Sequence, residues 1–174
     1  MPFAKKLAGR LRLNGLTAGR QFAAFRHMKI TDILRAEHTV FHHLFDHIEA
    51  TAPKLKTLAE VKSLASLVEK VMAPHSHTED QLFIEPLEHY MEQIGQCRNF
   101  HDEHDVIEGT LASVQKAKTV TIARKLLFSA VTASRKHFDK EERIVFPMAE
   151  RTLKLATLEA LGAEWMKRRE ASLK

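Results

Sequence analysis

The sequence predicts an all-α protein, an antiparallel up-down-up-down four-helix bundle with an additional C-terminal helix. Helix-forming residues dominate the 174-residue chain, which contains only 6 glycines and 5 prolines, and its β-branched residues are scattered rather than alternating. Four long stretches carry apolar residues at the 3.6-residue spacing of an amphipathic helix. The connections between these stretches are short, which favours antiparallel neighbours in a bundle.

The first two predicted helices cover about 31–50 and 57–84. In the first, Thr31 or Asp32 is expected to cap the amino end, and Ala52-Pro53 closes the helix. The second runs through Pro74, which should kink or break it because proline lacks a backbone donor. The periodicity rests on Ile33, Leu34, Phe41, Leu44, Phe45 and Ile48, then on Leu58, Val61, Leu64, Leu67, Val68 and Val71.

The remaining helical segments are predicted at about 86–94, 98–116, 119–146 and 152–169. The segment at 86–94 should end at Gly95, and the segment at 119–146 should stop near Pro147. The last segment is amphipathic, contains Trp165 and ends in "KRRE". Its apolar side could cap the bundle or pair with another chain.

Length and composition favour one folded domain. We expect a basic arm or leader at 1–29, the bundle at 30–150 and the extra helix at 151–174. No apolar run approaches the roughly 20 residues of a membrane-spanning helix. The single cysteine, Cys97, excludes an internal disulfide and a four-cysteine zinc site, and it favours a reducing, cytoplasmic location.

The positive charge of the chain is concentrated at its beginning. Residues 1–30 carry seven basic side chains and no acidic one, whereas the rest of the chain has two more acidic than basic residues. The core domain is therefore not expected to bind nucleic acid. The leader has three interpretations: an organellar transit peptide, a basic arm that contacts membrane or nucleic acid, or an extraneous extension ahead of Met28.

Two segments repeat one pattern. The stretches "PHSHTEDQLFIEP" at 74–86 and "KHFDKEERIVFP" at 136–147 each hold a histidine, a glutamate four residues later, an apolar run and a proline. The pairs are His75 with Glu79 and His137 with Glu141. Because i and i+4 side chains project from one face of a helix, each pair can hold one metal ion or present a carboxylate between two ions.

The other two long helices each supply one histidine, His38 in "AEHTV" and His104 in "DEHDV". The order of a lone histidine followed by a His-x-x-x-Glu pair thus occurs twice in the chain. In a pseudo-twofold bundle these six side chains would converge on one core site. Four imidazoles and two carboxylates suit iron, manganese or zinc. Five phenylalanines should pack around the site and keep it dry: Phe41, Phe45, Phe83, Phe128 and Phe146.

These motifs resemble those of the hemerythrin-like, HHE cation-binding domain. The resemblance covers about 30–150 and rests on the spacing of the six positions. It implies a four-helix bundle that holds two non-haem iron ions, bridged by carboxylate and by an oxo or hydroxo group. The histidines would be terminal ligands, with Glu79 and Glu141 as the bridges.

The pattern also departs from that of the oxygen-carrying hemerythrins. Those proteins place two ligand histidines four apart on the third helix, where this chain has Phe100 four residues before His104. Their fourth helix uses a carboxylate five residues after the histidine, a position that Glu142 occupies here, so Glu142 is an alternative bridge. His42, one turn from His38, is a candidate supplementary ligand or an outer hydrogen-bond partner.

The leading hypothesis is a di-iron protein that binds or reduces O₂, nitric oxide or peroxide in sensing or stress defence, with a separate signalling partner if it signals. True enzymatic turnover, iron storage or donation, iron-centre repair and a metal-free structural bundle are the alternatives. Other kinds of metal site and a phosphate-binding loop are excluded because the sequence lacks their motifs. No histidine has a glutamate three residues before it, as a ferritin-like site requires, and the chain has neither His-Glu-x-x-His nor a glycine-rich phosphate loop.

Overall fold

The chain is all-α, as the sequence predicts. The computed structural model describes residues 27–93 and 97–171, and these residues form helices and no strand. Residues 1–26 of the predicted basic arm and the predicted helix end at Gly95 lie outside the described residues. The long helices are α3 (Ile30–Thr51), α4 (Leu58–Glu79), α6 (Cys97–Lys116) and α7 (Val120–Lys140); the others are α5 (Glu85–Gln93), α8 (Phe146–Thr152) and α9 (Leu155–Ala171).

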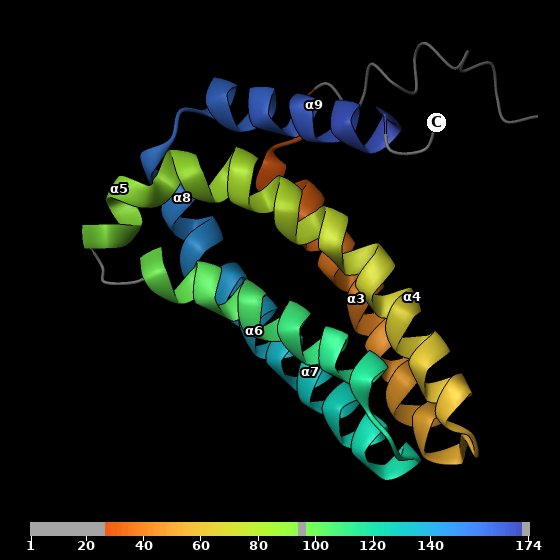
Figure 1. The fold of residues 1–174 in the computed structure, drawn as a ribbon. Helices are drawn as coiled ribbons and strands as arrows, with labels where there is room; N and C mark the ends of the chain where they lie inside the picture. Colours follow the sequence, from red (N-terminus) through yellow and green to blue (C-terminus); the bar gives the residue numbers. More distant parts are fainter. Residues whose placement is uncertain (1–26, 94–96, 172–174) are drawn as a thin grey trace, which may run out of the picture.

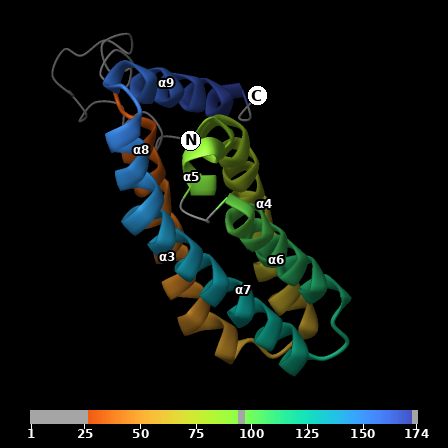
Figure 2. The ribbon, with the colours of Figure 1, turned by 90° about the vertical axis from the view of Figure 1, so that its left-hand side faces the viewer.

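The four long helices form one group, in which α7 packs against α6 and α3, and α6 packs against α4 (Figures 1 and 2). Helix α9 lies across one end of this group, close to the beginning of α3 and to α5 and α8. The up-down-up-down order of the four long helices stays a prediction. No helix in 27–93 or 97–171 has the length and apolar character needed to cross a membrane.

Local sequence signals account for two helix starts. At α4, the Thr57 side chain accepts from the Glu60 backbone N–H, and the Glu60 carboxylate accepts from the Thr57 N–H at 2.8 Å, which completes a capping box. At α7, the Thr119 hydroxyl accepts from the Ile122 N–H.

The predicted cap of α3 is wrong. Lys29 is the N-cap residue and makes no side-chain capping bond, while Thr31 and Asp32 lie inside the helix. The Thr31 hydroxyl instead donates to Glu150 Oε1 at 2.7 Å. A contact with α8, far along the chain, therefore takes the hydroxyl that local sequence would assign to capping.

Pro74 and Pro147 do not break the helical path. Helix α4 continues through Pro74, so the predicted break is wrong there, and a kink at Pro74 stays a prediction. The fourth long segment does not stop near Pro147, because a π-helical turn, η3 (Glu141–Val145), leads directly into α8, which has Pro147 in its first turn. The first turn of a helix tolerates proline because the N–H that proline lacks has no intrahelical acceptor there.

Two apolar clusters lie on either side of a polar layer. One fills the space between the four long helices, and the other lies beneath α9. Of the five phenylalanines expected in the core, four are buried and Phe128 is partly buried. Buried members of the first cluster include Phe41, Phe45, Leu111, Leu127 and Phe138; those of the second include Ile30, Leu34, Phe83, Phe146 and Trp165.

Candidate metal centre

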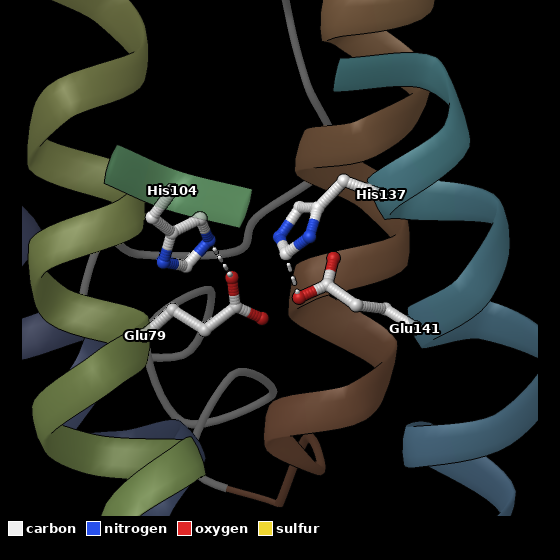
Figure 3. A group of neighbouring side chains, drawn as sticks. All are labelled: Glu79, His104, His137 and Glu141. Atoms are coloured by element: carbon white, nitrogen blue, oxygen red, sulfur yellow. Dashed lines mark ion pairs between the residues drawn. The ribbon is translucent and has the colours of Figure 1, made fainter. Parts of the chain in front are cut away.

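The six residues singled out by the repeat all lie between the two apolar clusters. Each is at most 5% exposed, although the set comprises four imidazoles and two carboxyl groups. They come from α3, α4, α6, α7 and the first position of η3: His38, His75, Glu79, His104, His137 and Glu141. Figure 3 shows four of them pointing toward one another from α4, α6 and the α7–η3 segment.

Each carboxylate lies between two histidines. Glu79 Oε2 is 3.5 Å from Nε2 of His75, one turn earlier, and 3.8 Å from Nε2 of His104. Glu141 lies in the same way between His137, in its own repeat, and His38, on α3. Its Oε1 is 3.1 Å from His137 Nε2, and its Oε2 is 3.3 Å from His38 Nε2. The i, i+4 pairs thus face inward, and each meets a histidine from another helix.

The ligand atoms fall into two groups, within each of which all atoms lie within 4.8 Å of one another. One group contains Glu79, His104, His137 and Glu141, and the other contains His38, His75 and Glu79. Glu79 belongs to both. The arrangement could therefore hold a metal ion in each group, with a carboxylate shared between the groups.

A π-helical turn marks both carboxylates. Helix α4 ends at Glu79 and passes into η2 (Asp80–Ile84), while α7 ends at Lys140 and passes into η3, which begins at Glu141. A π-turn inserts one extra residue into a helix and is frequent at functional sites. Both repeats therefore widen the helix at the same point, where the glutamate enters the core.

Each of the four histidines has its outer ring nitrogen against a second carboxylate. His75 Nδ1 is 2.8 Å from Glu37 Oε2, and His137 Nδ1 is 2.8 Å from Glu103 Oε2. An Nδ1–H that donates to a carboxylate leaves the Nε2 lone pair directed into the site. The ring orientation and the tautomer of each imidazole are fixed by a partner on a different helix.

The other two histidines have the same kind of support. His104 Nδ1 is 3.1 Å from Asp80 Oδ1, and His38 Nδ1 is 3.0 Å from Glu142 Oε1. Glu142, the alternative bridge, thus lies on the outer side of His38. Sequence reasoning missed these partners, although a signal was present: every one of the four is adjacent in sequence to a residue of the site, in Glu37-His38, Glu79-Asp80, Glu103-His104 and Glu141-Glu142.

Burial controls the charges in the site. It raises the pKa of the Glu141 carboxyl to about 8 and that of Glu79 well above 4.5, where the charge of Glu141 adds to the effect. Burial also lowers the pKa of His38 and of His75. For His104, burial acts to lower the pKa, but the hydrogen bond to Asp80 and the nearby carboxylates outweigh it and raise the pKa. Without a cation, the carboxyl groups of this core are driven toward their neutral form.

The buried donor atoms support a fit to metal. Several buried atoms of the site lack a hydrogen-bond partner among the described residues: Nε2 of His38, His75 and His104, and all four oxygens of Glu79 and Glu141. Outside the site, the only such atom among the described residues is Nε of Arg124. Buried polar atoms are nearly always satisfied, so a concentration of exceptions needs an explanation, and a bound metal ion would supply one. Imidazole nitrogen and carboxylate oxygen together suit iron, manganese or zinc.

The other histidines lie outside this cluster. His42 Nδ1 is 3.1 Å from the Arg135 guanidinium, which donates to it, so its position does not suit the role of supplementary ligand. His101, three residues before His104, lies near the surface with Nδ1 3.2 Å from Asp80 Oδ1. The histidines at 43, 47, 77 and 89 are exposed.

The fold and the site define a helical domain with a buried cluster of histidines and carboxylates that could hold metal. Residues 29–149 match the family model of the hemerythrin HHE cation binding domain. The chain therefore belongs to this family, as the resemblance indicated. Comparison with curated proteins and with solved structures gave no match.

Proposed function

We propose that the protein is a non-haem di-iron protein that binds or reduces O₂, nitric oxide or peroxide in sensing or in oxidative and nitrosative stress defence. The single observation that carries the proposal is the concentration, at five of the six residues of the cluster, of buried polar atoms that find no hydrogen-bond partner among the described residues. The family match to a cation-binding domain supports it. The proposal includes an antiparallel arrangement of α3, α4, α6 and α7, whose inward faces supply the ligands.

In the proposed site, the histidines are terminal ligands and the glutamates are bridges. His38 and His75 would hold one ion, and His104 and His137 the other, because each pair lies in a separate group of ligand atoms. Glu79 and Glu141 would bridge, since each carboxylate contacts a histidine of both groups. Two bound ferrous ions would supply two electrons to a small oxidant and open positions for a diatomic ligand.

The surrounding side chains limit access of water to the site. The His38 ring stacks on Phe138 with the ring centroids 4.0 Å apart, and the Phe41 ring meets His75 edge-on at 5.0 Å. Phe146 also stacks on His38, with the ring centroids 5.5 Å apart. Apolar rings around the ligands reduce the local dielectric and exclude proton donors, which favours retention of a reactive small ligand.

The test is the metal content of the purified protein, measured by elemental analysis together with an absorption spectrum. We expect about two irons per chain, since each of the two groups of ligand atoms would hold one ion. His75→Ala combined with His137→Ala should remove the iron, whereas His77→Ala, an exposed histidine two residues from His75, should retain it. Unchanged iron content in the double variant would overturn the proposal.

Reactivity then separates binding from catalysis. A sensor should form a long-lived oxygenated or oxidised state after exposure to O₂, nitric oxide or peroxide. A catalyst should return rapidly to its starting spectrum and consume excess oxidant or nitric oxide over many cycles. Stopped-flow spectra with one equivalent and with a large excess of each small molecule distinguish these behaviours.

A further inference from the structure

Helix α9 reaches one of the carboxylates that support the site. Trp165 Nε1 donates to Glu37 Oε1 at 3.0 Å, and Arg169 donates to both oxygens, Nε to Oε1 at 3.0 Å and Nη2 to Oε2 at 2.7 Å. The same Glu37 Oε2 lies 2.8 Å from His75 Nδ1. A continuous chain of hydrogen bonds therefore runs from α9 through Glu37 to His75.

The groups in this chain are packed as well as hydrogen-bonded. Trp165 is fully buried, and its ring meets the His75 ring edge-on with the centroids 5.6 Å apart. The Arg169 guanidinium lies 4.8 Å from the centre of the Trp165 ring. Bidentate arginine–carboxylate pairs fix geometry more strongly than a single hydrogen bond. Glu37, and with it the His75 ring, is thus held from two directions.

The equivalent carboxylate of the second repeat has different surroundings. Glu103, which supports His137, accepts from Lys140 Nζ at 2.8 Å, a donor on the same helix as the histidine. Its side chain is 36% exposed, against 25% for Glu37. Glu103 also lines a groove of about 250 Å³ together with Val106, Ile107 and Ala133, on α6 and α7.

We propose that α9 makes the two halves of the metal centre unequal, with Trp165 and Arg169 as positioning residues that hold Glu37 and His75 in place. The half formed by His38 and His75 is then the retentive one, and the half formed by His104 and His137 exchanges its ion first. This inference rests on the proposed two-metal function. It adds that the C-terminal helix, beyond the matched 29–149 segment, controls retention at one subsite.

The experiment is chelator-driven release of iron(II) from the intact, iron-loaded protein under anaerobic conditions. The wild type should release its metal in two phases of about one ion each, one for each group of ligand atoms. Arg169→Ala and Trp165→Phe act on His75 through Glu37, so they should accelerate the slow phase by up to about tenfold, the lower end of the effect of losing a direct partner of a ligand, and leave the fast phase unchanged. Arg169→Lys, which keeps the charge but not the bidentate contact, should fall between these variants and the wild type.

Arg168→Ala is the matched control. Arg168 is on the same helix, but its guanidinium donates to Gln81 and Glu164 rather than to Glu37. Its substitution should leave both phases unaltered. Lys140→Ala provides the mirror test, since it removes a donor to Glu103 and should accelerate the fast phase only.

A second readout identifies the affected ligand. In the cobalt(II)-substituted protein, the Nδ1–H protons of the ligand histidines give exchangeable, paramagnetically shifted proton resonances, and Arg169→Ala should move the resonance of His75. A wild type that binds no metal would overturn the proposed function together with this inference. A wild type that binds two ions, with an unchanged slow phase in both α9 variants, would overturn the inference alone. Equal acceleration of both phases would also overturn it, because it would indicate general loosening of the fold.

Discussion

Replacement of Glu79 by methionine should stabilise the metal-free protein and destabilise the metal-loaded one. Glu79 is fully buried, and within the described part of the chain neither of its carboxylate oxygens has a hydrogen-bond partner. Its separations of 3.5 and 3.8 Å from the nearest histidine nitrogens are longer than hydrogen bonds. Methionine has a similar length and no group that requires solvation, so it removes a cost without leaving a large cavity.

The expected gain follows from the cost of an unsatisfied buried group. Such a group costs about 1–3 kcal/mol, and replacing buried ionic groups by apolar ones stabilises proteins by up to about 4 kcal/mol. We therefore expect the free energy of unfolding of Glu79→Met to rise by about 1–3 kcal/mol in the presence of a chelator. With iron at 100 times its dissociation constant, each ion adds about 2.7 kcal/mol to the native state, so two ions add about 5.4 kcal/mol to the wild type. This exceeds the gain of about 1–3 kcal/mol, and the order reverses if Glu79→Met loses both ions.

The measurement is urea unfolding followed by circular dichroism, with and without iron, on wild type and variant. Glu92→Met, an exposed glutamate on α5, is the control and should change stability by less than about 0.5 kcal/mol in either condition. Loss of stability in the chelator-treated Glu79→Met protein would refute the reasoning. So would a variant that retains its full stabilisation by iron, because Glu79 belongs to both groups of ligand atoms.

Three further outcomes test the fold and the site. Gly162→Ala should lower the free energy of unfolding by about 1–3 kcal/mol, because a Cβ there would overlap the Met28 carbonyl oxygen. Gly109→Ala, where a Cβ meets nothing, should raise the free energy of unfolding by up to about 1 kcal/mol. The free energy of unfolding of the metal-free protein should fall from pH 6.5 to 8, because the pKa values of Glu141 (to about 8), Glu79 and His104 are raised in the folded protein, which therefore keeps protons that the unfolded chain releases. Below pH 6.5 the lowered pKa values of His38 and His75 act in the opposite direction. Glu141→Gln should make the decline shallower, and a slope unchanged by the substitution would contradict the assignment. Thr57→Ala removes the capping box and should cost about 1 kcal/mol in urea unfolding, and no loss would show that the cap is dispensable.

The six residues of the candidate site were predictable because their spacing is a property of the helix itself. The i, i+4 separation places His75 with Glu79, and His137 with Glu141, on one helix face whatever the neighbouring helices do. The failures involve contacts between distant parts of the chain. Thr31 makes a side-chain bond to Glu150 that no local rule contains, and the π-turn that carries the chain into Pro147 has no signal in apolar periodicity.

The outer carboxylates illustrate the same limit at the site. Their residue types and positions beside the ligands are visible in the sequence, but their partners depend on how the helices are aligned. Glu37 is adjacent to His38 in sequence, yet it supports His75 on the next helix. Adjacent residues on a helix point about 100° apart, so a residue beside a ligand naturally faces a neighbouring helix rather than the same ion.

The pattern of these contacts interlocks the two repeats. Asp80 follows the glutamate of the first repeat but supports His104 of the second, and Glu142 follows the glutamate of the second but supports His38 of the first. A single repeat of two helices would leave one of its histidines without its carboxylate. The two-fold sequence pattern therefore requires both halves of the chain to complete either subsite. The halves differ at the outer carboxylates: Lys140, within the second repeat, donates to Glu103, whereas Trp165 and Arg169 of α9, outside both repeats, donate to Glu37.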